Sequence, residues 1–276
     1  RQRWLKEFLK AFLVVFSVYA CMYFVRNNLK AAKPLLKNQL GFTTSELGYI
    51  GFGFSITYAM GKTILGYFVD GKNAKRIIST LLIMSATMVF IIGIILLSGN
   101  KAVGTILVFW GLSGFFQAPG GPSSYSTISR WTPTNKRGRF LGFWNMSHNI
   151  GGALAGMIAL FGANTFFHGN VAGMFIVPAI VGICVGFVLL FVGKDEPQEL
   201  GWNSAEEIFN EPRVQSDAEI EEMSKFEIFK KYVLTNPWIW VLCIANVFVY
   251  IVRFGIDNLA PLYVTEQLHF AMNDAV

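Results

Sequence analysis

Two arginines occupy matching places in two apolar segments near opposite ends of the chain. Residues 23–26 read YFVR and residues 250–253 read YIVR, and a proline follows each arginine eight residues later. An arginine deep in a bilayer costs about 2.5–3.5 kcal/mol even on the insertion scale. A chain that bears this cost twice, at Arg26 and at Arg253, is built from repeats, binds an anion with the arginines, or both.

A phosphate group suits such a pair of arginines. Guanidinium is planar and permanently charged, and it can hydrogen-bond two phosphate oxygens at once. One arginine undercompensates a dianion, whereas two roughly balance it. The site would then pass through a low-dielectric region more easily when it is loaded than when it is empty, because in the empty site the arginines repel each other. This reasoning predicts exchange of phosphate compounds rather than net uptake.

Arg253 lies deep in its apolar segment, on a polar stripe. At 100° per residue, Asn246, Tyr250, Arg253 and Asp257 fall on one side of a helix. Such a stripe on an apolar helix is expected to face a water-filled cavity rather than lipid. An alternative is a structural ion pair between Arg253 and Asp257, four residues apart. The two interpretations are compatible.

Arg26 and Lys62 have a second interpretation because each lies near the end of an apolar segment. Either side chain can extend toward water and leave its apolar stem in the membrane. The matching sequence around Arg253 favours a cavity position for Arg26, and Tyr23 lies on the same helical face. For Lys62 the functional interpretation is an additional positive charge for phosphate.

His148 is flanked by two amides within the fifth apolar segment. Asn145 and Asn149 lie on neighbouring helical faces, which favours a polar cavity wall. Histidine titrates near physiological pH, so His148 is able to gain charge when phosphate arrives. The alternative is an ordinary core histidine with its hydrogen bonds satisfied.

The composition indicates an all-α membrane protein that crosses the bilayer several times. Of 276 residues, 53% are hydrophobic and only 14% charged, and the apolar residues form long blocks. The three cysteines match no metal or disulfide spacing. We expect no metal, no cofactor and no nucleic-acid partner. No nucleophile–base pair is evident, so an enzyme is disfavoured.

Seven spans are predicted, joined by short polar connectors except for one long hydrophilic stretch. The expected spans are residues 10–32, 47–69, 77–98, 105–128, 140–166, 171–193 and 238–264. This order predicts three parts: a six-helix half over 1–193, a linker over 194–237, and the first helix of a second half over 238–276. We therefore expect a fragment of a 12-helix protein with parallel repeats.

Basic residues in the short connectors predict the orientation. Arginines and lysines cluster before the first span, after the second and after the fourth, and are sparser in the alternate connectors. The positive-inside rule then places the N-terminus and the 194–237 stretch in the cytoplasm. The first and seventh spans therefore run in the same direction.

Glycines and prolines indicate close and kinked helix packing in the fourth and fifth spans. Pro119 and Pro122 should kink the fourth span, and glycines such as Gly151 allow close approach of helices. Two interpretations remain open: helices that slide during function, or ordinary tight packing.

The loop after the second span resembles the signature loop of the major facilitator superfamily. It carries Gly66 and Asp70 followed by basic residues that include Lys72 and Arg76, although Gly71 and Asn73 depart from the usual pattern. The resemblance implies that this loop takes part in conformational change and that the fold is the major facilitator fold.

The chain also resembles the organophosphate:phosphate antiporters, on their hexose phosphate branch. The motifs that carry this resemblance are residues 23–28, 53–58, 61–63, 70–73, 125–128, 131–133, 141–145, 147–149, 250–253 and 255–257. It implies that Arg26 and Arg253 bind the substrate phosphate from the two halves, with Lys62 and His148 nearby. It further implies a monomeric bacterial inner-membrane protein that exchanges hexose 6-phosphate for inorganic phosphate.

Two other functions are kept open. One is a related antiporter for glycerol 3-phosphate or phosphoglycerate. The other is a membrane receptor that senses sugar phosphate and signals to a partner kinase, for which residues 194–237 are the candidate docking segment.

Overall fold

Helices dominate the computed structural model, which describes residues 2–69, 71–210 and 223–268. No strand occurs within these ranges. The side chains of Lys225, Asp257 and Asn258 lie outside the described part. The long helices are α1 (Gln2–Leu40), α2 (Thr44–Val69), α3 (Ala74–Leu97), α4 (Val103–Gln117), α5 (Gly120–Trp131), α6 (Thr134–Phe166), α7 (Gly173–Phe191) and α11 (Pro237–Glu266). The short ones are η1 (Pro197–Leu200), α8 (Ala205–Ile208), α10 (Lys225–Ile228) and the π-helix η2 (Phe229–Leu234).

Six segments of the described chain are long and apolar enough to cross a membrane. They are α1, α3, α4 together with α5, α6, α7 and α11, and they coincide with six of the seven predicted spans. The remaining predicted span, 47–69, forms the 26-residue helix α2. Glycines, hydroxyl residues and Lys62 lower the hydropathy of α2, which is not among the six.

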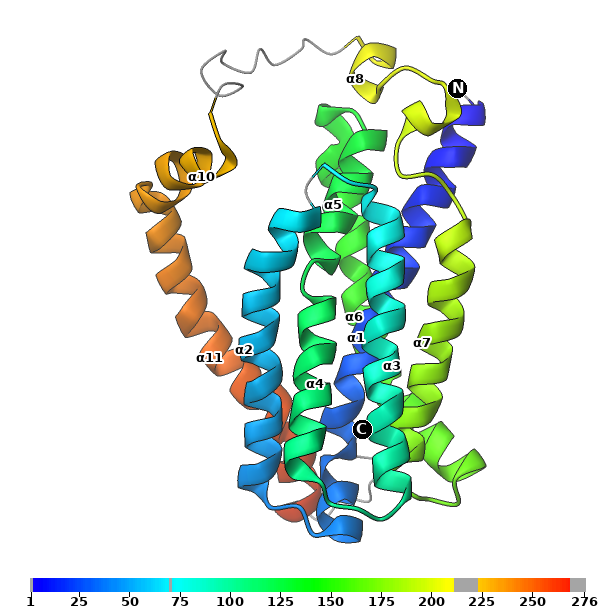
Figure 1. The fold of residues 1–276 in the computed structure, drawn as a ribbon, viewed down its shortest axis with the longest axis vertical. Coiled ribbons are helices and arrows are strands. Elements are labelled where there is room, and N and C mark those ends of the chain that lie inside the picture. The colour runs from blue at the N-terminus through cyan, green and yellow to red at the C-terminus, as the bar shows by residue number, and fades with distance from the viewer. Residues whose placement is uncertain (1, 70, 211–222, 269–276) are drawn as a thin grey trace.

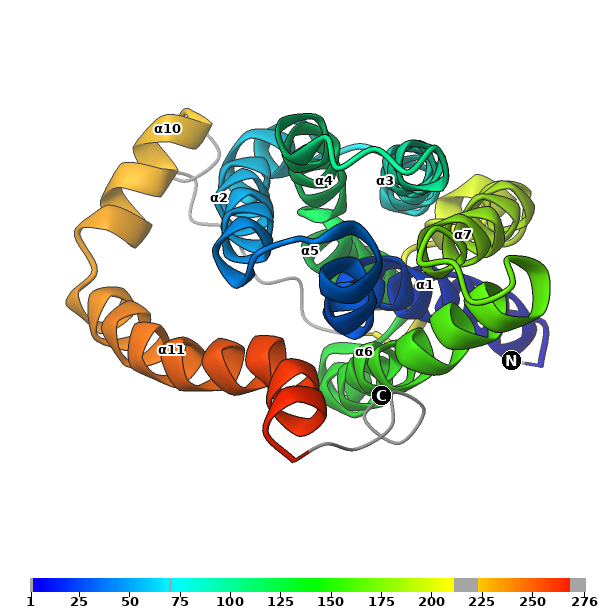
Figure 2. The same cartoon turned by 90° about the horizontal axis from the view of Figure 1, so that it is seen from below.

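Helix α1 runs through the centre of the bundle (Figures 1 and 2). It is 39 residues long and packs mainly against α6 and α7. Its valines Val15, Val18 and Val25 are completely buried. At its closest approach to α6, a Cβ on Gly151 would lie 2.1 Å from the carbonyl oxygen of Ala20, so only glycine fits there. The predicted close approach at Gly151 is confirmed.

The predicted fourth span is broken into two helices. Helix α4 ends at Gln117, and α5 begins at Gly120 after Ala118 and Pro119. Proline has no N–H to donate and its ring obstructs the preceding turn, which explains the break. At Gly120 a Cβ would lie 2.7 Å from the sulfur of Met22, so the break also brings α5 close to α1.

Helix α11 stands beside the bundle and runs in the same direction as α1, as the sequence predicts (Figure 1). The two helices approach each other near their C-terminal ends, where Leu262 is buried and Lys37 pairs with Glu266. Most of the preceding part of α11 is exposed. The described helices therefore leave α11 in contact with α1 at one end of the bundle.

Candidate functional site

Arg26 lies midway along α1 among aromatic rings. Its guanidinium carbon is 3.8 Å from the centre of the Tyr23 ring, 5.4 Å from that of Tyr58 and 6.0 Å from that of Phe54. A guanidinium group over aromatic faces is attracted by the ring quadrupoles. No carboxylate of a described residue forms an ion pair with Arg26. The aromatic rings thus hold the cation without neutralising it.

Tyr58 on α2 connects Arg26 with Lys62. The Lys62 amine lies 5.0 Å from the centre of the Tyr58 ring, while Arg26 lies 5.4 Å from the same centre. Lys62 follows Tyr58 by four residues, so both side chains lie on one face of α2. Lys62 is exposed at this position. One tyrosine ring therefore sits next to both predicted cations of the first half.

Helix α6 places His148 against the same aromatic group. The rings of His148 and Tyr23 have their centres 5.2 Å apart. One turn along both helices, Tyr19 and Trp144 are paired in the same way, with centres 4.6 Å apart. Spacings of four residues on α1 and on α6 produce this matched pairing. His148 is half-buried, and the predicted cavity residues Asn145 and Asn149 are exposed.

Arg253 on α11 lies close enough to His148 to act on its charge, as Arg26 does. The side chain of Arg253 is exposed, as are those of Asn246 and Tyr250 on the predicted polar stripe. The Asn246 amide donates a hydrogen bond to the Leu242 carbonyl of its own helix, at 2.8 Å. The Tyr250 ring stacks on Phe254, with centres 5.2 Å apart.

The proposed fourth member of that stripe, Asp257, has a side chain that lies outside the described residues. The alternative ion pair between Arg253 and Asp257 therefore stays an open prediction.

The structure brings Arg26, Lys62 and His148 together around Tyr23 and Tyr58, with Arg253 in electrostatic reach. Three helices of the bundle and α11 contribute to this group. Positive groups at the centre of helices, with aromatic rings as their neighbours, form a site that can bind a multiply charged anion. The role of each residue in binding remains a prediction.

Tyr58 was not selected from the sequence as a site residue, and neither was Trp144. Tyr58 lies in the same short sequence as Lys62, four residues before it. That spacing was a usable signal, because residues i and i+4 share a helical face. The contact with Arg26 on another helix had no local signal.

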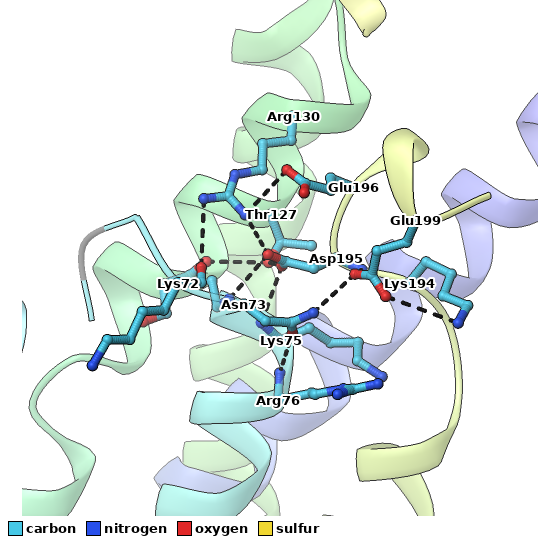
Figure 3. Close-up of polar contacts among 12 residues, drawn as sticks. Lys72, Asn73, Lys75, Arg76, Thr127, Arg130, Lys194, Asp195, Glu196 and Glu199 are labelled. Carbon is cyan, nitrogen blue, oxygen red and sulfur yellow. Dashed lines mark hydrogen bonds and ion pairs between the residues drawn. The ribbon is translucent and has the colours of Figure 1, made fainter. Parts of the chain in front are cut away.

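A second polar cluster lies at the end of the bundle that holds the N-terminus (Figures 1 and 3). At its centre is the fully buried Asp195. The Asp195 carboxylate accepts hydrogen bonds from the backbone N–H groups of Ala74 and Lys75, both at 3.0 Å. It also accepts one from the Thr127 hydroxyl at 2.5 Å and forms an ion pair with Arg130. The cluster therefore joins the chain after α7 to the start of α3 and to the end of α5.

Glu199 extends this cluster along the chain after α7. Its carboxylate accepts hydrogen bonds from the Asn73 amide at 2.8 Å and from the backbone N–H of Asp195 at 2.9 Å. The Lys75 amine donates to three carbonyl groups at the end of α7, those of residues 190, 192 and 193. The first part of the predicted 194–237 linker is thus packed onto the helices rather than separate from them.

The loop residues selected from the sequence take part in this cluster mainly through their backbone. The Lys72 carbonyl accepts a hydrogen bond from Arg130 at 3.5 Å, and the Arg76 N–H donates to Asn73, which caps α3. Both side chains are exposed. Gly66 lies in α2, and Asp70 lies outside the described residues. The sequence identified this region but missed Asp195 and Arg130 as its central ion pair.

Comparison with known proteins identifies the fold family. The model of the Major Facilitator Superfamily matches residues 15–276. A solved structure of a bacterial homolog of the human lysosomal transporter Spinster, in an inward-facing and unoccupied conformation, superposes with a TM-score of 0.73. That match covers 96% of this chain and 57% of the other at 19% identity, a level at which only the fold is shared.

Three curated relatives are transporters of phosphorylated compounds. The hexose-6-phosphate:phosphate antiporter of Escherichia coli strain K12 is 46% identical over 100% of this chain. The glycerol-3-phosphate transporter of Bacillus subtilis and the phosphoglycerate transporter protein of Salmonella typhimurium are each 33% identical, over 97% and 95% of this chain. The chain spans 60%, 60% and 57% of the length of these three proteins.

Proposed function

This chain belongs to the major facilitator superfamily, and we propose that it forms part of a bacterial inner-membrane antiporter that exchanges hexose 6-phosphate for inorganic phosphate. The observation that carries the proposal is Arg26, which lies near three aromatic rings and which no described carboxylate neutralises. The chain is also 46% identical to an antiporter named for this exchange.

In this proposal Arg26 and Arg253 bind one phosphate group from two sides. A hexose phosphate dianion balances the two guanidinium charges, Lys62 adds positive charge at its edge, and His148 lies beside it. The loaded site is nearly neutral, whereas the empty site contains opposed cations. Rearrangement between the two access states is then easier with cargo than without it, which gives exchange.

A second candidate substrate is glycerol 3-phosphate or phosphoglycerate. Relatives named for these compounds are 33% identical to this chain, against 46% for the hexose 6-phosphate antiporter. Both classes present the same phosphate dianion to the arginines. Inhibition of exchange by a series of competing phosphates distinguishes them, because the compound that inhibits at the lowest concentration binds the site most tightly.

We further propose that the N-terminus lies in the cytoplasm and that one copy of the protein is the working unit. The connectors that join at the N-terminal end of the bundle carry most of the basic residues, which favours a cytoplasmic position. The candidate site is built from helices of a single chain, so no second copy is needed to complete it.

Exchange of radiolabelled phosphate in proteoliposomes tests the proposal. The full-length protein should exchange phosphate and be inhibited by external glucose 6-phosphate. Arg26→Lys and Arg253→Lys should each abolish exchange, because lysine keeps the charge but loses the planar fork. Arg139→Lys is the matched control, since Arg139 is exposed at the start of α6. Normal exchange by either site variant would contradict the arginine site, and absence of exchange by the unmodified protein would favour the receptor.

A further inference from the structure

Residues 224–240, here named the interfacial segment, stand apart from the helical bundle. The segment contains α10, the π-helix η2 and the start of α11. Helix α10 projects away from the bundle in both views (Figures 1 and 2). The main packing partner of η2, apart from α10, is the start of α11. The side chains of this segment are therefore largely uncovered by the other described helices.

The uncovered side chains are aromatic to an unusual degree. Phe226 is 69% exposed, Phe229 44%, Tyr232 41%, Trp238 75% and Trp240 53%. Water is a poor solvent for such a surface, and a patch of this kind marks a contact with protein or membrane. Tryptophan and tyrosine are enriched where membrane helices enter the headgroup layer.

Basic residues are interleaved with these rings. Residues 224–234 contain three lysines, at 225, 230 and 231, and a single acidic residue, Glu227. The Glu227 carboxylate already accepts hydrogen bonds from the N–H and the hydroxyl of Ser224, both at 2.8 Å. These hydrogen bonds also lower the pKa of Glu227. The segment thus presents excess positive charge that complements anionic headgroups.

A hydrogen-bonded corner joins the segment to the membrane-spanning helix. The Asn236 side chain caps α11 by accepting a hydrogen bond from the Trp238 N–H at 3.0 Å, and Pro237 occupies the first helical position. The Trp240 indole donates to the Leu234 carbonyl at 2.8 Å. Because α11 is long and apolar enough to span the bilayer, this corner sets the depth of the segment at the entry to the span.

We propose that the interfacial segment lies in the headgroup layer of the bilayer that α11 crosses, with its aromatic rings among the acyl chains and its lysines on anionic lipid phosphates. Continuity with α11 supplies the depth, the aromatic rings supply apolar contact, and the lysines supply charge attraction. Each lysine near an anionic surface contributes about 1 kcal/mol to such binding, which corresponds to about fivefold in affinity. The anionic contact holds the start of α11, the helix that carries Arg253.

Site-directed spin labels test the position of the segment. Single cysteines replace Phe226, Phe229 or Glu206 in full-length protein whose native cysteines are changed to serine, in nanodiscs of phosphatidylcholine with or without phosphatidylglycerol. We expect labels at 226 and 229 to collide with oxygen and to be protected from a water-soluble nickel reagent. The label at 206, on exposed α8, is the control and should be accessible to nickel.

Two results would overturn the proposal. Labels at 226 and 229 that are shielded from both reagents would show that another part of the protein covers the segment, and labels open to nickel would show that it lies in water. The lipid charge is tested separately with Lys230→Gln/Lys231→Gln. Labels should lie deeper with phosphatidylglycerol than without it, and this difference should become smaller in the double variant, which keeps only the lysine at 225. Equal depth in both lipids for the unmodified lysines would refute the anionic contact.

If the protein without its native cysteines does not fold, crosslinking of the native protein to photoreactive phosphatidylglycerol tests the same contact. Crosslinks should map to residues 224–240 and decrease at least severalfold in Lys230→Gln/Lys231→Gln. Crosslinks confined to other helices would contradict the proposal.

Discussion

Lys37 near the end of α1 forms an ion pair with Glu266 in the last turn of α11. The Lys37 amine also donates a hydrogen bond to the Thr44 hydroxyl at 3.2 Å. This pair joins the helices that carry Arg26 and Arg253 at the end where they approach each other. The N-terminal ends of the same two helices lie apart (Figure 1).

Removing this ion pair should increase the separation of the two helix ends. We expect Lys37→Gln to shift the distance between spin labels at Asn38 and Gln267 toward longer values. The pair is partly exposed, with side chains 24% and 44% accessible, so its contribution is within about 1 kcal/mol, or about fivefold in the ratio of populations. Lys37→Glu/Glu266→Lys should restore the original distribution. Identical distributions in Lys37→Gln and the unmodified protein would show that the pair has no such effect.

Tyr58 is expected to position Arg26 and Lys62 through its ring, and its hydroxyl also interacts with Arg26. Tyr58→Phe, which keeps the ring, should therefore lower the affinity for phosphate less than Tyr58→Leu, which should lower it about two- to thirtyfold, the range of one or two cation–π contacts. Phosphate binding measured by calorimetry checks this. Tyr49→Leu is the control, because Tyr49 is 63% exposed near the start of α2. Equal affinities for Tyr58→Leu and Tyr49→Leu would contradict a positioning role.

Asp195 should be essential for the stability of the bundle. Asp195→Asn leaves the Arg130 guanidinium without its buried countercharge, which should cost about 3 kcal/mol in the free energy of unfolding. Glu196→Gln is the matched control, since Glu196 is 38% exposed at 3.5 Å from the same guanidinium, and it should cost at most about 1 kcal/mol. The thermal unfolding midpoint in detergent, compared with that of the unmodified protein, reports the loss of stability in each variant. Similar midpoints for the two variants would show that burial of Asp195 does not matter.

Gly151 should tolerate no side chain, whereas Gly142 on the same helix should. A Cβ on Gly151 would overlap the Ala20 carbonyl of α1, and one on Gly142 would meet nothing within 4 Å. Gly151→Ala must therefore move α6 away from α1 and should lower the unfolding midpoint and the folded yield. Gly142→Ala should leave both unchanged or slightly raised, because alanine favours helix more than glycine does. Size-exclusion chromatography and thermal unfolding compare the two, and equal behaviour would refute the close contact.

Much of the helical arrangement was predictable from local patterns. Long apolar blocks give membrane helices because every backbone polar group must be satisfied within the segment. Pro119 beside Gly120 predicts a kink, and the structure has a break there. Helix α2 forms over the predicted span 47–69, while residues such as Thr57 and Lys62 keep its hydropathy below that of the six candidate spans.

The candidate site was only partly predictable. Arg26 and Arg253 have a signal in the sequence because a charge in an apolar helix is costly. Tyr58 and Asp195 have little signal in the sequence, because their importance comes from contacts with residues on other helices. In the sequence, Asp195 is one of several acidic residues that follow a membrane span. Its importance follows only from the positions of the start of α3 and the end of α5 around it.

The sequence by itself determined the membrane class, the helices, the common direction of α1 and α11, and two arginines that need a reason to be in apolar helices. These follow from residue type and period, which act within one segment. Only the tertiary structure decided that Tyr58 lies beside both Arg26 and Lys62, that His148 stacks on Tyr23, and that Asp195 is buried against Arg130. Such contacts depend on how helices pack and rotate against one another, and that depends on close approaches such as Gly151 on Ala20.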